Sequence, residues 1–313
     1  MSIDAVHGTK AAARGHDQLR ALVRACRPRQ WSKNLLVLAA PGAAGVLGHA
    51  NVAGKLVVAF ASFCMISSAT YLFNDLHDRA EDRLNPRRRE RPLASGALGT
   101  RLAGTAALLL ALGGVGLAAN VRWELAAVAV GYLLLTGSYT LWLRRIAVAD
   151  IAAIAGGFVL RALAGGAATG VAVSRWFMLV TSFGALFVVA GKRYAELCER
   201  EAAGGLSHKQ PGELVRASLR EYSAQYLRFV VGLAATVTTT AYCLWAFQRA
   251  HHARLSWYEL TIVPFVLWLL RYALLLDRGD GHSPEEIILG DGFLRAMSAT
   301  WLATFVCGVY IAG

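Results

Sequence analysis

Long apolar segments recur along most of this chain, and they constrain its fold more than any other feature. A membrane-spanning helix needs about 20 predominantly apolar residues, and segments near that length follow one another here with short polar connections between them. These segments lie at residues 35–50, 54–73, 101–119, 123–143, 147–170, 175–191, 226–248, 257–276 and 292–312. We therefore predict an all-α, polytopic membrane protein with nine transmembrane helices, of which the first and the sixth are short.

The composition leaves little material for anything else. Of the 313 residues, 56% are hydrophobic and only 17% are charged, so no separate soluble catalytic domain fits beside the spans. We predict a cytoplasmic N-terminal segment over residues 1–34 and a single membrane domain over residues 35–313. Any chemistry must then be carried by the helices or by their connections.

Residues 16–31 of the N-terminal segment have the pattern of an amphipathic helix that lies on the membrane surface. Their apolar face is expected to comprise Leu19, Leu22, Val23 and Cys26. No apolar stretch of signal-peptide length precedes this helix, so the segment is expected to be retained on the cytoplasmic side.

The charged residues indicate the orientation. The net charge is +12, which in a soluble protein suggests nucleic acid, but topology explains it better here because basic residues gather in cytoplasmic loops. With the N-terminus inside, 26 of the 32 Lys and Arg residues lie on the inner side and five lie outside, while Arg161 falls within a span. We predict a multi-pass protein of the cell membrane with a cytoplasmic active site, and no nucleic-acid partner.

An acidic triplet follows the second span. If the helix continues at about 100° per residue, Asp75, Asp78 and Asp82 lie on one face near the inner boundary of the membrane. Three carboxylates on one face repel each other unless a cation lies between them, and an all-oxygen ligand set suits Mg²⁺. The alternative is a solvated helix end whose charges pair with Arg79 and Arg83.

A run of arginines comes directly after the triplet. Arginine side chains bind phosphate oxygens in bidentate geometry, so a carboxylate–metal site beside an arginine run is typical of a diphosphate-binding site. The alternative is that these residues only set topology. The candidate phosphate ligands are Arg83, Arg87, Arg88 and Arg91.

These motifs resemble those of a known family. The N-D-x-x-D-x-x-x-D pattern over residues 74–82, followed by Arg-Pro-Leu-Ala-Ser-Gly, is similar to that of the UbiA superfamily of intramembrane prenyltransferases. Within the superfamily, residues 27–34, 191–196 and 283–291 resemble the polyprenyl-phosphate phosphoribosyltransferase branch. The resemblance implies a nine-helix bundle and catalysis that requires Mg²⁺ bound by Asp75, Asp78 and Asp82.

The second acidic motif of most superfamily members is missing. Its place holds Lys192, Arg193, Tyr194 and Glu196. Fixed positive charge there suits a donor with an extra phosphate, such as the 5-phosphate of phosphoribosyl diphosphate. The alternative is an ordinary basic helix end in which Lys192 pairs with Glu196 at i+4.

Other candidate substrate ligands lie at the inner ends of spans. Asn74 belongs to the first motif, and Tyr139 with Arg144 is similar to the tyrosine-plus-base pair of the superfamily, with one extra residue between them. For Asp150, as for Arg161, structural pairing competes with a role in the site. The remaining candidates are Lys33 and Asn34 at the start of the first span.

The resemblance implies transfer of 5-phosphoribose from phosphoribosyl diphosphate to a polyprenyl phosphate such as decaprenyl phosphate, in the synthesis of arabinan for cell walls. Two alternatives stay open: a related prenyltransferase that uses a prenyl diphosphate donor and an aromatic or glycerol-type acceptor, and a transporter. A transporter would place its polar residues at midplane near broken helices, whereas here they follow the ends of the spans. A homo-oligomer is compatible with the sequence.

Overall fold

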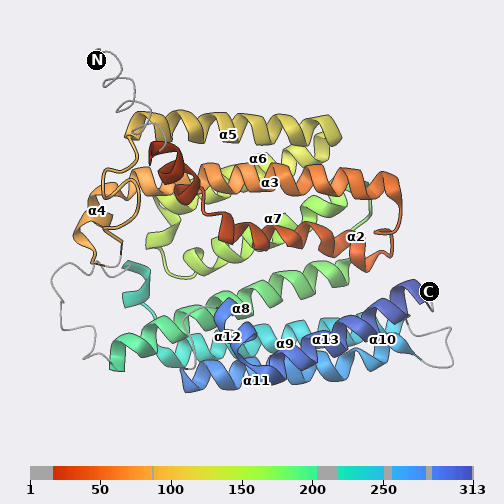
Figure 1. Cartoon of the computed structure of the whole chain (residues 1–313). Helices are drawn as coiled ribbons and strands as arrows, with labels where there is room; N and C mark the ends of the chain where they lie inside the picture. Colours follow the sequence, from red (N-terminus) through yellow and green to blue (C-terminus); the bar gives the residue numbers. More distant parts are fainter. Residues whose placement is uncertain (1–16, 87, 203–216, 250–255, 280–283, 312–313) are drawn as a thin grey trace, which may run out of the picture.

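The computed structural model describes residues 17–86, 88–202, 217–249, 256–279 and 284–311, and all regular structure in these ranges is helical (Figure 1). The long helices are α3 (Ala50–His77), α5 (Thr100–Val121), α6 (Trp123–Leu141), α7 (Ala149–Thr169), α8 (Arg175–Ala202), α9 (Ala224–Arg249), α11 (Ile262–Arg278) and α13 (Gly292–Val306). The short elements are η1 (Pro28–Leu38), α2 (Ala39–Ala43), α4 (Arg79–Leu84), η2 (Leu143–Arg145), η3 (Ala217–Arg220), α10 (Trp257–Leu260), α12 (Pro284–Gly290) and η4 (Cys307–Ile311). The predicted all-α class is confirmed.

Eight helical segments in the described part of the chain are long and apolar enough to cross a membrane, and they correspond to the second to ninth predicted spans. The first predicted span, residues 35–50, is instead built from the end of η1, the short helix α2 and a turn. A glycine explains the break, because Gly45 adopts a φ of +74° and the helical path ends after α2. The protein is thus a polytopic membrane protein, and a count of nine continuous helices is not confirmed.

The long helices form two groups (Figure 1). Helices α3, α5, α6 and α7 pack around a core that includes Phe63, Ile66 and Leu125. Helices α8, α9, α11 and α13 pack around a second core that includes Phe187 and Tyr272. Contacts between α7 and α8 join the groups.

The broken first segment lies against α3 and α7. Its approach to α7 is close, since a Cβ atom added to Gly165 would lie 1.8 Å from the carbonyl oxygen of Val37. Only glycine permits this backbone contact. As a result, η1 is embedded among the long helices, where its side chains reach the space on both sides of it.

The predicted N-terminal helix is present over residues 17–25. It packs through Ala21 and Ala25 against a cluster that includes Leu93, while Leu19 and Val23 are 57% and 52% exposed. The buried face is therefore centred on the two alanines, and Leu19 and Val23 are not packed on the protein. A surface helix with exposed apolar side chains fits a position at the membrane boundary.

The elements α4, η2 and η3 gather at one end of the bundle, on the left of Figure 1. Elements η2 and η3 contact each other. Just beyond them, the backbone N–H of Val148 donates to the hydroxyl of Tyr222, 74 residues further along the chain. The polar connections of α3, α6 and α8 therefore meet in one region, and the candidate site lies there.

Candidate active site

The acidic triplet spans a break between two helices. Helix α3 ends at His77 and α4 begins at Arg79, with Asp78 between them. The prediction of a continuous helix through the triplet is therefore wrong at Asp78. All three carboxyl groups are nonetheless buried, with exposed fractions of 2%, 4% and 1% for Asp75, Asp78 and Asp82.

Asp75 and Asp82 share one arginine. The guanidinium of Arg91 donates to Asp75 Oδ1 at 3.2 Å and to Asp82 Oδ2 at 2.7 Å. Asp75 Oδ1 also accepts a hydrogen bond of 2.6 Å from Arg27, the residue directly before η1. Arg88 lies 3.7 Å from Asp82 Oδ1, so this half of the site combines two carboxylates with three arginines.

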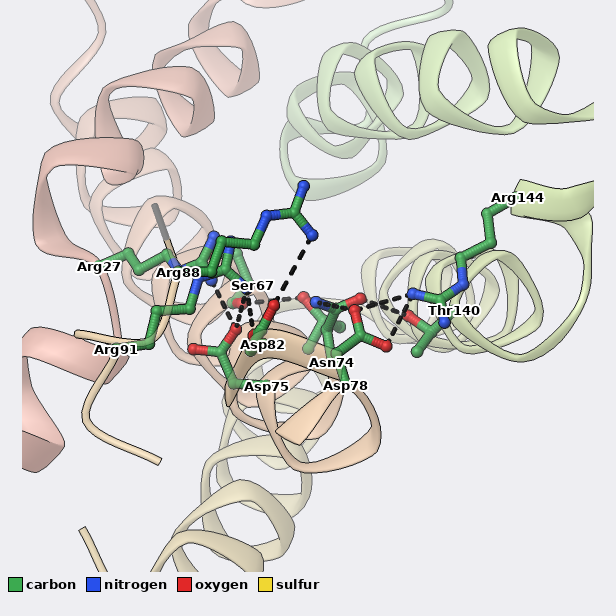
Figure 2. Close-up of polar contacts among 11 residues, drawn as sticks. Arg27, Ser67, Asn74, Asp75, Asp78, Asp82, Arg88, Arg91, Thr140 and Arg144 are labelled. Carbon is green, nitrogen blue, oxygen red and sulfur yellow. Dashed lines mark hydrogen bonds and ion pairs between the residues drawn. The ribbon is translucent and has the colours of Figure 1, made fainter. Parts of the chain in front are cut away.

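Asp78 faces the opposite way, as Figure 2 shows. Arg144 donates to its two carboxylate oxygens at 2.7 and 2.8 Å, and Asn74 donates to Oδ2 at 3.3 Å. Thr140 in turn donates to the side-chain oxygen of Asn74 at 3.3 Å. The Asp78–Arg144 pair thus ties the end of α3 to the connection between α6 and α7.

A polar cavity of about 520 Å³ opens between these groups. Its mouth has exposed arginines, such as Arg88 with 40% of its side chain exposed. Its other end is buried, with Tyr132 3% and Arg161 5% exposed. The lining includes the predicted residues Lys33, Asn74, Asp78, Asp82, Arg88, Arg91, Tyr139 and Arg144. The structure therefore brings together, around one cavity, residues from η1, α3, α4, α6 and α7.

The carboxylates suit a divalent cation by their chemistry, because oxygen donors are what Mg²⁺ prefers. One carboxylate oxygen has a lone pair available for it: Asp82 Oδ1 is buried and accepts no hydrogen bond within the described structure, although Arg88 lies 3.7 Å away. In the described residues no three acidic, histidine or cysteine side chains converge on one point. Mg²⁺ usually takes one or two carboxylates and completes its shell with water and phosphate, and Asp75 with Asp82 satisfies that requirement.

The second motif is folded differently from the prediction. Arg193 is 2% exposed and donates to Asp150 Oδ2 at 3.0 Å and to Glu196 Oε2 at 2.9 Å. Neither Arg193 nor Asp150 lines the polar cavity. A guanidinium held between two carboxylates has its charge already balanced, so this geometry favours a structural role for Arg193.

A tyrosine completes this buried cluster. The Tyr222 hydroxyl donates to Asp150 and accepts from the backbone N–H of Val148, a β-branched residue with a φ of +67°. Burial, followed by the hydrogen bond to Asp150, raises the pKa of Tyr222 above its ordinary value. The cluster therefore holds the strained turn before α7, and with it the segment that carries Arg144.

The remaining predicted residues lie in several places. Asn34 is fully buried and bonds to Cys64, Ser67 and Arg161, so it anchors η1. Arg83 donates to the carbonyl of Ala94 and supports the loop after α4. Outside the cavity lie Lys192, which is exposed, and Tyr194, which is buried between Arg228 and Asp277; Arg87 lies outside the described residues.

The sequence reading missed part of the lining. Arg27 belongs to the motif at residues 27–34 but was not singled out, although it binds Asp75. Tyr132, Thr136 and Thr140 also line the cavity. Their four-residue spacing on an otherwise apolar span was a signal that could have identified them.

A second cavity, of about 580 Å³, lies on the other side of η1. Lys33 of η1 lines the polar cavity, whereas Ser32, Leu35 and Leu36 line the second one. Its other walls come from α2, α8, α9 and α13 and include Trp176, Trp245, Trp301, Leu302, Phe305 and Val306. Leu302 is 55% and Leu35 54% exposed, so this apolar cavity reaches the surface of the bundle.

Residues 35–297 match the UbiA prenyltransferase family, and this chain belongs to that family. A UbiA homolog from Archaeoglobus fulgidus bound to GPP and Mg²⁺ has the same fold, with a TM-score of 0.68 at 17% identity over 92% of this chain and 99% of that one. The structure of a digeranylgeranylglyceryl phosphate synthase also matches, with a TM-score of 0.67 at 17% identity over 93% and 98% of the two chains.

Curated relatives are closer in sequence. The chain is 41% identical over 296 residues to the decaprenyl-phosphate phosphoribosyltransferase of Corynebacterium glutamicum, and this match covers 93% of this chain and 87% of the relative. It is also 41% identical over 303 residues to the enzyme of that name from Mycolicibacterium smegmatis, with 93% of each chain covered. The family predicted from the sequence is thereby confirmed.

Proposed function

We propose that this chain is a membrane-bound transferase that moves 5-phosphoribose from phosphoribosyl diphosphate to decaprenyl phosphate and releases diphosphate. The observation that carries the proposal is the 41% identity, over nearly the whole chain, to enzymes named decaprenyl-phosphate phosphoribosyltransferase. The polar cavity supports it, because both carboxylates and arginines line it.

The arginines at the mouth bind the diphosphate of the donor. Arg27, Arg88 and Arg91 present guanidinium groups within one small region beside Asp75 and Asp82. Each charge-assisted hydrogen bond to phosphate contributes about 1.5–3 kcal/mol. Together they orient the C1–O bond of the donor and stabilise the diphosphate as it leaves with the bonding electron pair.

Asp75 and Asp82 would hold Mg²⁺, while Asp78 pairs with Arg144. When bound, this ion neutralises charge on the leaving diphosphate. Because Arg91 occupies both Asp75 and Asp82 in this structure, the arginine must shift towards the substrate phosphate when the carboxylates take a cation.

The acceptor needs no dedicated base. A phosphate monoester is already anionic near neutral pH, so its oxygen attacks C1 directly while the bond from C1 to diphosphate breaks. Its polyprenyl tail fits the apolar cavity beyond η1, whose walls are aromatic and aliphatic. We also propose that the site faces the cytoplasm across the cell membrane, where the water-soluble donor is available.

The test is an assay of the purified protein against both donor classes. Phosphoribosyl diphosphate with decaprenyl phosphate and Mg²⁺ should give phosphoribosyl lipid and diphosphate, whereas a prenyl diphosphate with an aromatic acceptor should give no product. Asp75→Asn and Asp82→Asn should each lower turnover by at least 100-fold, about 2.7 kcal/mol in barrier, with unchanged elution from a sizing column. Transfer of a prenyl group in place of phosphoribose would refute the proposal.

A further inference from the structure

The buried end of the polar cavity carries a positive charge whose partners are neutral. Arg161 of α7 donates from Nε to the side-chain oxygen of Asn34 at 3.0 Å and from Nη1 to the carbonyl of Gly157 at 3.2 Å. Its Nη2 donates to the hydroxyl of Tyr132. In the described part of the chain no carboxylate lies within ion-pair distance of Arg161.

Such a charge is costly. Burial of an ion without a counter-charge costs several kcal/mol even after relaxation, and ionisable residues within spanning helices usually mark substrate pathways. Arg193 offers the internal comparison, because it is equally buried but lies between two carboxylates and outside the cavity. Of these two buried arginines, Arg161 is the one that lines the cavity with unbalanced charge.

The wall between Arg161 and the mouth is lined with hydroxyl groups. Tyr132, Thr136 and Thr140 follow one another on α6, and Thr70 of α3 also lines the cavity. At a rise of 1.5 Å per residue, the eight steps from Tyr132 to Thr140 span about 12 Å. A shaft of this length accommodates a pentose with a phosphate at each end, and its hydroxyls can bond to those of the sugar.

The buried end of the cavity distinguishes the phosphate of a polyprenyl acceptor from the terminal phosphate of a sugar donor. A polyprenyl phosphate at this end would have to place its tail in the hydroxyl-lined shaft, because beyond Tyr132 the ring packs on Phe63 in the apolar core at 5.6 Å. A terminal phosphate that projects from a sugar needs no such exit. The donor therefore fits the shaft, with its diphosphate at the arginine-rich mouth.

We propose that Arg161 is the ligand for the second anionic end of the donor, the 5-phosphate, and that Tyr132 and Asn34 orient its guanidinium. This inference rests on the proposed function and assigns to Arg161 the role that the sequence suggested for Lys192 and Arg193. It makes Arg161 the residue that distinguishes phosphoribosyl diphosphate from ribosyl diphosphates without a 5-phosphate.

The test compares donor binding and kinetics in Arg161→Gln, Arg161→Lys and the wild type. Loss of one charge-assisted phosphate contact corresponds to about a 10- to 150-fold loss of affinity. Arg161→Gln should therefore lower the affinity for phosphoribosyl diphosphate at least tenfold, as measured both by the Michaelis constant and by calorimetric titration. The affinity for an analogue that lacks the 5-phosphate should change less than about twofold, and Arg161→Lys should recover part of the donor affinity.

Tyr132→Phe provides a milder variant, since it keeps the ring and removes only the hydroxyl that orients Arg161. Tyr132→Phe should lower the affinity for the donor by a smaller factor and leave the affinity for the analogue unchanged. Arg193→Gln, a change outside the cavity, should affect the affinities for donor and analogue equally.

Equal weakening of donor and analogue by the Arg161 variants would overturn the inference and leave Arg161 as a structural residue. A raised Michaelis constant for polyprenyl phosphate alone would also overturn it, because the closed end would then hold the acceptor. Wild-type protein that binds no phosphoribosyl diphosphate refutes the proposed function, whereas normal donor binding by Arg161→Gln refutes only this assignment.

Discussion

Replacement of Arg193 by methionine tests whether the second motif supports the fold or binds substrate. Methionine fills a similar volume but removes the charge between Asp150 and Glu196. Asp150 is fully buried, and although Ser218 and Tyr222 still donate to it, it loses its ion-pair partner. We expect Arg193→Met to lower the stability of the protein markedly.

The magnitude follows from burial. Removal of one partner from a buried ion pair costs about 3–5 kcal/mol. At roughly 2–4 °C per kcal/mol for a domain of intermediate size, the melting temperature should fall by roughly 6–20 °C. A second change, Asp150→Asn, should recover part of this loss, because it removes the uncompensated charge.

Thermal unfolding in detergent, followed by tryptophan fluorescence, measures the effect. Lys192→Ala is the matched control: Lys192 is the exposed neighbour of Arg193, and a surface charge contributes only about 0–1 kcal/mol. If Arg193→Met melts like the wild type while its Michaelis constant for the donor rises tenfold, the structural argument fails and Arg193 is a phosphate ligand after all.

Four further outcomes are expected. Chelation of divalent cations by EDTA should abolish turnover and added Mg²⁺ should restore it, whereas activity that persists in EDTA contradicts the metal site. Asp78→Asn, measured by the same assay, should lower turnover by at least an order of magnitude. Gly165→Leu should destabilise the bundle in thermal unfolding, because any side chain collides with the backbone of η1, whereas Gly104→Ala, which meets nothing within 4 Å, should be neutral or slightly stabilising. In a cysteine-free background, Arg122→Cys should react with an impermeant thiol reagent in intact cells and Arg88→Cys should not; the reverse pattern would invert the proposed orientation.

Features that depend on local spacing were predictable from the sequence. The spans after the first follow from apolar length. Asp75, Asp82, Arg88 and Arg91 fall within one short stretch of sequence, so their contacts are local. The break at Asp78 was not predictable from helical spacing alone. It lets this carboxylate pair with Arg144, 66 residues away.

Contacts between distant segments explain the rest. Arg27 reaches Asp75 across 48 residues, and Arg161 meets Asn34 across 127, so neither pairing has a signature in local sequence. The charge pattern at residues 192–196 was visible, but its direction was not: on a helix, the residue after Lys192 points to a different side. That difference of one position puts Arg193 between Asp150 and Glu196 and leaves Lys192 exposed.

The apolar cavity beside η1 determines how the reaction rate depends on the amount of lipid acceptor. Because its walls include side chains exposed at the surface of the bundle, an acceptor whose tail binds there, as we propose, would reach it by diffusion within the plane of the bilayer. The quantity that governs occupancy is then the mole fraction of acceptor in the surrounding lipid, and bulk concentration has no direct meaning. Added detergent or inert phospholipid should slow the reaction by surface dilution at constant total acceptor, while the dependence on the water-soluble donor keeps its ordinary form.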